Sequence, residues 1–170
     1  NQIFTCKYFP QKHGRLLTSG GLGTMGYALP AAIGVKVAKP GRQTVVVCGD
    51  GSFQMAMNEL AAIRCADLDI KILVFQNHTL GLVHQIQKSV PYHGPFGVDL
   101  DGSPDFAAIA AAYGIPSIMV REEEELDEAI AEMLVHDGAY VLVANVETCG
   151  MVFPMVPAGA SVTNMILGDK

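Results

Sequence analysis

The stretch Thr44-Val45-Val46-Val47-Cys48-Gly49-Asp50-Gly51-Ser52 decides the fold class of this chain. It opens with β-branched and apolar residues, which are typical of a strand that is buried on both faces of a sheet. The run passes directly into Gly49-Asp50-Gly51, and a helix-length segment begins at Phe53. In open α/β sheets, ligands bind at the carboxyl ends of the strands. The stretch therefore predicts a strand, a turn and a helix, with Asp50 at a binding edge.

Strand-length and helix-length segments alternate along the rest of the chain. We expect strands at residues 16–18, 44–48, 70–76, 117–120 and 140–146. We expect helices at residues 23–39, 53–66, 80–88, 104–113 and 123–136. Residues 89–103 contain several Pro and Gly without periodicity, so they predict a long loop, a kind of segment that is often functional. The order of the segments predicts an α/β fold with a mostly parallel central sheet flanked by helices on both faces.

Composition limits the classes of partner and location. The chain has 170 residues, the length of one domain, and 50% of them are hydrophobic, which is sufficient for a sizeable core. Its net charge of −6, with 11 Lys and Arg, predicts no nucleic-acid partner. No apolar run reaches the roughly 20 residues that a membrane span needs, so we expect no membrane partner. The four cysteines are far apart and mostly in apolar runs, which predicts buried free thiols and a cytoplasmic location.

The chain opens abruptly and without Met. We therefore expect residues 1–170 to be one domain and a fragment of a longer polypeptide.

A metal site is predicted where two neighbouring strands end. Asn77 follows the strand expected at residues 70–76, as Asp50 follows the one before it. A right-handed β-α-β connection places both strand ends on the same edge, so we expect Asp50 and Asn77 to meet. Mg²⁺ takes about six oxygen ligands. Asp50, Asn77 and the backbone carbonyl of Thr79 are the candidate protein ligands, and phosphate oxygens near Gly51 would complete the shell.

These loops carry a resemblance to a known family. Gly49-Asp50-Gly51 followed after 25 residues (52–76) by Asn77 resembles the thiamine diphosphate fingerprint, with Gln76 in place of the first Asn of the usual pair. Five further stretches are similar to the carboxyl-terminal domain of acetolactate synthase (acetohydroxyacid synthase): residues 17–26, 28–34, 58–64, 80–83 and 154–159. The last of these stretches discriminates best, because related decarboxylases share it less readily.

The resemblance implies a thiamine diphosphate-binding fold, of which this chain is the diphosphate-binding domain, with thiamine diphosphate and Mg²⁺ as cofactors. The carbonyl of Gly23 would accept from the aminopyrimidine, Met25 would support the bent cofactor, and Asn1 falls where the family has a phosphate-contacting His. The implied cofactor-binding residues are Gly23, Met25, Gly49, Asp50, Gly51, Ser52, Asn77, Thr79, Leu80, Gly81 and Leu82. No residue matches the family's activating glutamate, which would come from an aminopyrimidine-binding domain of the same or a neighbouring chain.

The implied activity is that of a transferase that condenses pyruvate with a second 2-oxoacid and releases CO₂, as in branched-chain amino acid biosynthesis. A homodimer or homotetramer and a small regulatory subunit would accompany it. Ile86 stands where the family usually has a Trp linked to 2-oxobutyrate preference, so the acceptor and the use of FAD stay open. Another thiamine diphosphate decarboxylase or carboligase, and a non-catalytic cofactor-binding or assembly module, are the alternatives.

A more distant alternative is an NAD(P)-dependent oxidoreductase. Residues 21–26 satisfy the dinucleotide pattern G-x-G-x-x-G, and a helix is expected there. The acidic residue that such a site needs about 20 positions further on would have to be Asp50. Because Asp50 lies inside a Gly-Asp-Gly turn, it is expected to face phosphate rather than ribose.

Overall fold

The computed structural model describes residues 1–10, 15–89, 94–148, 150–157 and 159–168. Within these ranges four strands form one sheet in the order β1-β2-β4-β3, and every pair is parallel. The strands are β1 (Thr44–Gly49), β2 (Ile70–Gln76), β3 (Ser117–Val120) and β4 (Tyr140–Asn145). The predicted α/β fold is thus confirmed, and the carboxyl ends of β1 and β2 lie side by side, with Gly49 paired to Phe75.

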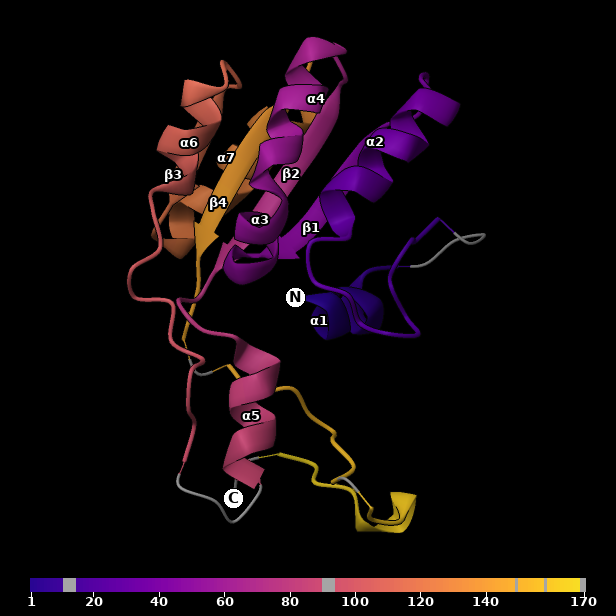
Figure 1. Cartoon of the computed structure of the whole chain (residues 1–170), viewed down its shortest axis with the longest axis vertical. Coiled ribbons are helices and arrows are strands. Elements are labelled where there is room, and N and C mark those ends of the chain that lie inside the picture. The colour runs from indigo at the N-terminus through magenta and orange to yellow at the C-terminus, as the bar shows by residue number, and fades with distance from the viewer. Residues whose placement is uncertain (11–14, 90–93, 149, 158, 169–170) are drawn as a thin grey trace.

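Helices cover both faces of this sheet, and α1 (Gln2–Tyr8) and α5 (Gly81–Ser89) lie below it, as Figure 1 shows. The other α-helices are α2 (Ala28–Ala38), α3 (Asp50–Ala56), α4 (Leu60–Cys65), α6 (Phe106–Ala112) and α7 (Leu126–Val135). Short 3₁₀ turns are η1 (Met57–Glu59), η2 (Glu123–Glu125) and η3 (Val162–Asn164). Leucine, isoleucine, phenylalanine and alanine side chains of α2, α3, α4 and α6 pack on one face in the larger core cluster. Residues of α7 pack on the other face, against β3 and β4.

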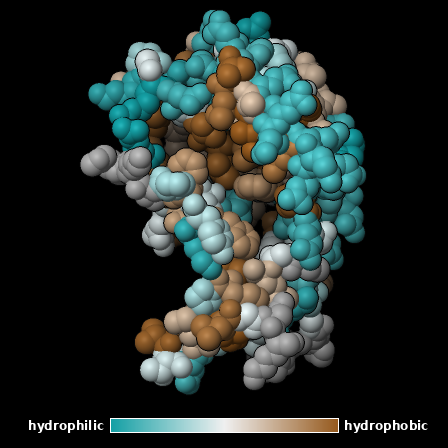
Figure 2. Space-filling model, turned by 180° about the vertical axis from the view of Figure 1, so that it is seen from behind, coloured by the Kyte–Doolittle hydropathy of each residue, from teal (hydrophilic) through white to brown (hydrophobic). Residues whose placement is uncertain are grey.

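The face behind the sheet is only partly covered. α7 lies over β3 and β4, whereas Val45 of β1 is 44% exposed. Figure 2 shows apolar side chains gathered on this side of the molecule, and a hollow between the upper body and the lower part. None of the described helices is both long and apolar enough to span a bilayer.

Two predicted elements are wrong. Residues 16–18 form no strand, and Leu17 is 60% exposed, because no described strand lies beside them to pair with their backbone groups. The helix expected at residues 23–39 begins only at Ala28. Gly23 and Gly26 have φ angles of 61° and 80°, which an α-helix cannot contain.

Other boundaries differ by less. The helix expected at residues 53–66 begins earlier, at Asp50, and is interrupted by η1. The one expected at residues 123–136 starts as η2, where Glu122 and Glu125 form a capping box. α1 lies where no element was expected. Of the cysteines, Cys48 is buried as predicted, but Cys6 and Cys65 are exposed. Residues 90–93 of the predicted loop, Cys149 and Ala158 lie outside the described residues.

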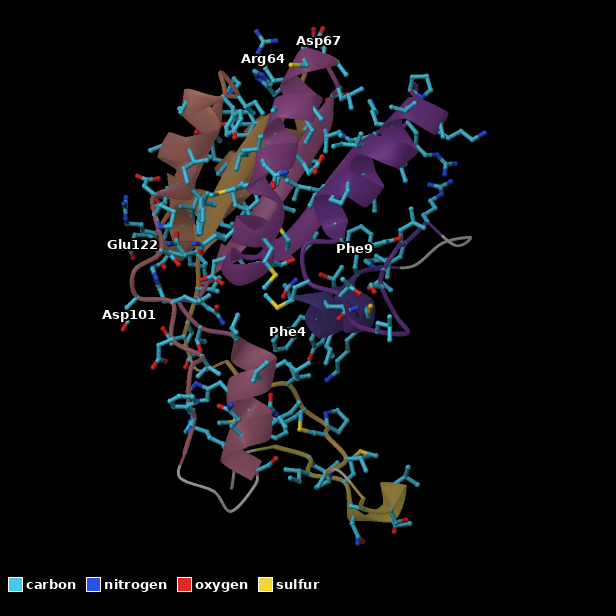
Figure 3. All side chains as sticks on the ribbon, viewed as in Figure 1. Phe4, Phe9, Arg64, Asp67, Asp101 and Glu122 are labelled. Atoms are coloured by element: carbon cyan, nitrogen blue, oxygen red, sulfur yellow. The ribbon has the colours of Figure 1, made fainter. Side chains whose placement is uncertain are left out.

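An ionic cluster closes the amino end of the sheet. Lys71 is 1% exposed, and its ammonium group donates to Asp69 at 2.6 Å and to the carbonyls of His136 and Gly138 at 2.6 and 2.5 Å. Lys36 reaches the other oxygen of Asp69 at 3.3 Å. Figure 3 places Arg64 and Asp67 near this end of the sheet and Asp101 near the opposite end.

Candidate functional site

Asp50 is the centre of the carboxyl edge of the sheet. It is the first residue of α3, directly after β1, and it is 2% exposed. Its Oδ1 accepts from the N–H of Gly51 at 2.8 Å, and its Oδ2 accepts from the N–H groups of His78 at 2.8 Å and Asn77 at 3.2 Å. The prediction that Asp50 and Asn77 meet is therefore correct: the carboxylate joins the ends of β1 and β2.

The turn after β2 is stabilised by the side-chain amide of Asn77. Asn77 Oδ1 accepts from the N–H of Thr79 at 3.3 Å, and His78 between them has a φ of 56°. Non-glycine residues adopt this left-handed conformation at a cost of about 1–3 kcal/mol, and it is common at functional sites. Thr79 is buried, and its hydroxyl donates to the carbonyl of Val98 at 3.1 Å.

A segment of the long loop completes this edge. Leu80 N–H donates to the carbonyl of Val98, and Leu100 N–H donates to the carbonyl of His78, both at 2.8 Å. These bonds form an antiparallel bridge between Thr79 and Asp99. Residues 98–100 of the loop expected at residues 89–103 are thus part of the site. The irregular composition of the loop suggested a functional role, but no sequence signal identified Val98 or Leu100.

Three apolar side chains converge over Gly51. A Cβ atom on Gly51 would lie 2.7 Å from Leu80 Cδ2, and 3.2 Å from both Leu100 Cδ1 and Met25 Cε. Leu80 and Met25 come from separate loops, and both were predicted cofactor-binding residues. The structure therefore brings Leu80 and Met25 together beside Gly51, where the absence of a side chain lets another group approach the backbone.

The loop before α2 is tied to the same place through Ser52. Ser52 Oγ accepts from the N–H of Gly26 at 2.9 Å, and Ser19 Oγ accepts from the N–H of Thr24 at 3.0 Å. Gly23 lies within this loop and is exposed. The hydroxyl oxygen of Ser52, a predicted cofactor-binding residue, thus orients the glycine loop.

The other predicted cofactor-binding residues around Asp50 differ in how exposed they are. Gly49 lies against Asn1, whose side-chain amide atom is 3.2 Å from a Cβ built on the glycine. A Cβ on Gly81 would lie 3.2 Å from Asn77 Nδ2. A side chain at Gly49 or at Gly81 would therefore crowd a neighbouring polar side chain. Leu82, by contrast, lies on α5 with 41% of its surface exposed.

The electrostatics of the site fit a divalent cation. Within the described ranges the ion pairs are those of Asp69 with Lys36 and Lys71 at the far end of the sheet, so the buried Asp50 carboxylate has no cationic side chain beside it. Three backbone N–H groups hydrogen-bond this carboxylate, and its negative charge can still be neutralised by a bound cation. Among the described residues no cluster of three or more His, Cys, Asp or Glu side chains occurs, which leaves amide and carbonyl oxygens as the further ligands here. Such oxygen ligands suit Mg²⁺.

The adjacent thiol is inert. Burial, and secondarily the negative charge of Asp50, raises the pKa of Cys48 to about 12. Since the thiolate is the reactive form, Cys48 supplies no nucleophile to this edge.

Comparison with known proteins decides the family. The sequence pattern described as thiamine pyrophosphate enzyme, C-terminal TPP binding domain, matches residues 1–144. The chain belongs to this family. Thiamine pyrophosphate is the same compound as thiamine diphosphate, so the cofactor expected from Gly49-Asp50-Gly51 and Asn77 is the one that defines the domain.

The relatives of this thiamine diphosphate-binding domain include several acetolactate synthases. The chain is 38% identical to a probable acetolactate synthase large subunit of Methanococcus aeolicus and 37% identical to the acetolactate synthase isozyme 1 large subunit of Escherichia coli, over 98% of its own length. It is 40% identical to acetolactate synthase 2, chloroplastic, of Zea mays over 99% of its length. The domain spans only 28–30% of these relatives.

The dinucleotide interpretation loses its structural context in this domain. A dinucleotide-binding glycine loop follows a strand and opens a helix. Residues 21–26 precede α2, but residues 16–18 before them form no strand. The glycine loop instead contacts the turn that holds Asp50. Gly26 donates to Ser52, and Met25 lies beside Gly51.

Proposed function

We propose that this chain is the cofactor-anchoring domain of an acetolactate synthase that uses thiamine diphosphate and Mg²⁺. The observation that carries the proposal is the Asp50 carboxylate, which is buried without a cationic side chain and held by the N–H groups of Asn77 and His78. Asp50, Asn77 and the carbonyl of Thr79 would hold the metal. Gly49, Gly51 and Ser52 would take the diphosphate. Gly23, Met25, Leu80, Gly81 and Leu82 would line the rings.

Each part of the chain has a limited task in this function. The bound cofactor supplies an electron sink for decarboxylation of a 2-oxoacid. The residues around Asp50 anchor and orient it, and the apolar side chains Leu80, Leu100 and Met25 exclude water beside Gly51. The activating glutamate would come from an aminopyrimidine-binding domain of the same or a neighbouring chain.

The rest of the proposal concerns the whole enzyme. Its substrates would be pyruvate and a second 2-oxoacid, and it would act in the cytoplasm as a homodimer or homotetramer, with a small regulatory subunit as a further partner. Ile86 leaves the choice of acceptor and the binding of FAD to experiment. Because the activating glutamate has no counterpart here, the isolated 170 residues should form no acetolactate.

Calorimetric titration of thiamine diphosphate with and without Mg²⁺ tests the anchoring role. In the full-length enzyme, Asp50→Asn should lose at least about 100-fold in Mg²⁺-dependent affinity, because the metal loses its charged ligand while a similar shape is kept. Asp101→Asn is the matched control, an exposed aspartate at the same end of the sheet (Figure 3), and should change nothing. Unchanged affinity in Asp50→Asn, or binding of NADH in place of thiamine diphosphate, contradicts the proposal.

A further inference from the structure

Helix α5 presents its apolar residues and buries a polar one. Leu82, Val83 and Ile86 are 41%, 42% and 46% exposed, whereas Gln85 is 6% exposed and is the buried residue of the helix. A surface helix ordinarily buries its apolar stripe and exposes its polar side chains. Since α5 does the reverse, hydrophobic packing does not explain how it is held.

The buried carboxamide of Gln85 pairs with the backbone of one residue of the carboxyl-terminal tail. Nε2 donates to the carbonyl of Val152 at 2.8 Å, and Oε1 accepts from the N–H of Val152 at 2.8 Å. Nε2 also lies 3.6 Å from the Sδ atom of Met155. Both backbone groups of Val152 are therefore satisfied by a single side chain.

The tail beyond Val152 has its own structure and a second anchor. Met155 and Ile166 exchange two backbone hydrogen bonds at 2.9 and 2.8 Å. The ammonium group of Lys7 donates to the carbonyl of Phe153. Figure 1 shows α5 and this tail side by side below the sheet. Gln85 thus joins α5 to a folded segment that is itself attached to α1.

His84, the polar residue next to Gln85, makes no such hydrogen bond to the described part of the tail. His84 points toward the same tail, beside Thr148 and Met151, but within the described chain neither of its buried ring nitrogens has a hydrogen-bond partner. The adjoining cavity of about 10 Å³ has room for about one water molecule. The direct polar link between α5 and the tail is therefore the Gln85 pair.

We propose that Gln85 is a positioning residue that sets the rotation of α5, so that Leu82 and Ile86 face the cofactor and the 2-oxoacid. Leu82 and Ile86 are four residues apart and share one face of the helix. Gln85 lies about 100° around the axis from Ile86, so holding one side chain fixes the direction of the others. This inference rests on the proposed function, because it assigns the exposed apolar face of α5 to the bound substrate.

The test compares two chemically identical changes on one helix, made in the full-length enzyme. Gln85→Met keeps the length of the side chain but cannot pair with Val152. Gln87→Met is the matched control, because Gln87 pairs in the same manner with the backbone of Phe96, at 3.2 and 2.9 Å, on another side of α5. The readouts are hydrogen exchange at the Val152 amide, kcat and KM for the 2-oxoacid, and the Kd of thiamine diphosphate with Mg²⁺.

Gln85→Met should speed exchange at Val152 by about 10- to 100-fold, the effect of losing two hydrogen bonds. It should raise KM for the 2-oxoacid about tenfold and change the cofactor Kd by less than about twofold, because the phosphates are anchored at Asp50. Gln87→Met should leave Val152 exchange and KM unchanged. Gln85→Glu keeps the acceptor for the Val152 N–H but sets a buried carboxylate oxygen against the Val152 carbonyl, so it should not restore Val152 exchange or KM.

Unchanged Val152 exchange in Gln85→Met overturns the pairing. Faster exchange with an unchanged KM makes Gln85 a tail anchor only, and an equal loss of cofactor affinity indicates general destabilisation; either result overturns the positioning role. An unmodified enzyme that binds no thiamine diphosphate overturns the proposed function as well, so the two failures are distinguishable.

Discussion

The backbone N–H of His78 donates to the carboxylate of Asp50 at 2.8 Å, and His78 reaches this position with a φ of 56°. The left-handed residue turns the chain sharply after β2, which directs the N–H groups of both Asn77 and His78 at the same carboxylate oxygen. The predicted metal ligand Asp50 is therefore oriented by the turn that carries the predicted ligand Asn77. The backbone conformation of His78 therefore helps to orient the predicted metal ligands.

His78→Val should damage both stability and cofactor binding. A β-branched residue at this positive φ should lower the free energy of unfolding by about 1–2 kcal/mol and displace the N–H from Asp50. We expect about a tenfold loss of Mg²⁺-dependent affinity for thiamine diphosphate in titration calorimetry. His78→Asn removes the imidazole but tolerates the conformation, and should stay close to the unmodified protein. Equal losses in the two variants would assign the effect to the imidazole instead.

Gly51→Ala should weaken both cofactor binding and the fold. The new Cβ meets the flexible ends of Leu80, Leu100 and Met25 rather than backbone, so we expect a cost of about 1–2 kcal/mol in urea unfolding. Because the displaced side chains and the methyl group occupy the approach to the backbone, affinity for thiamine diphosphate should fall at least about tenfold. Gly34→Ala, in open space on α2, should instead be neutral or stabilising. A Gly51→Ala protein with normal affinity would argue against phosphate approach at this residue.

The three described cysteines should react at very different rates. Cys48 is buried and its pKa is raised to about 12, so it stays protonated at pH 8, whereas Cys6 and Cys65 are exposed. With iodoacetamide at pH 8, peptide mass mapping should show Cys48 labelled at least about 100-fold more slowly than the other two. All three should react together in guanidinium chloride. Rapid labelling of Cys48 in the native protein would show that β1 opens readily.

Asp69 should stabilise the fold at neutral pH and lose this effect in acid. Burial alone raises the pKa of Asp69, but its hydrogen bonds and charge attraction to Lys71 and Lys36 outweigh burial and lower the pKa below its ordinary value. A lowered folded-state pKa contributes stability above the unfolded value of about 3.9, and this is lost as pH falls through the folded value. The difference in unfolding free energy between unmodified protein and Asp69→Asn should therefore shrink below about pH 4.

Asp67→Asn is the control for this pH series. Asp67 is exposed, lies two residues away, and has a φ of 49° that Asn tolerates. Its difference from the unmodified protein should not change with pH in the same way. A pH-independent effect of Asp69→Asn would contradict the ionic role of the cluster.

Much of the candidate site follows from residues that are close in sequence. The buried run ending at Gly49 and the run ending at Gln76 predict two parallel strands, and parallel strands put Asp50 and Asn77 on one edge. The two wrong secondary-structure predictions arise where a local sequence pattern is misleading. A helix was expected from residue 23 because residues 28–39 continue in a helical pattern, but the positive φ angles of Gly23 and Gly26 exclude a helix before Ala28. Residues 16–18 have strand composition, but no described strand pairs with them.

The sequence alone determined the fold class, the family resemblance and the edge of the sheet that carries Asp50, because hydrophobic periodicity and strand-end residues are local properties of the chain. Only the tertiary structure decided that Leu80, Leu100 and Met25 meet over Gly51, and that Gln85 pairs with Val152. These contacts join segments as many as 75 residues apart (25 to 100). Nothing in either segment alone specifies its partner, since the pairing depends on how the sheet and its connections bring them together.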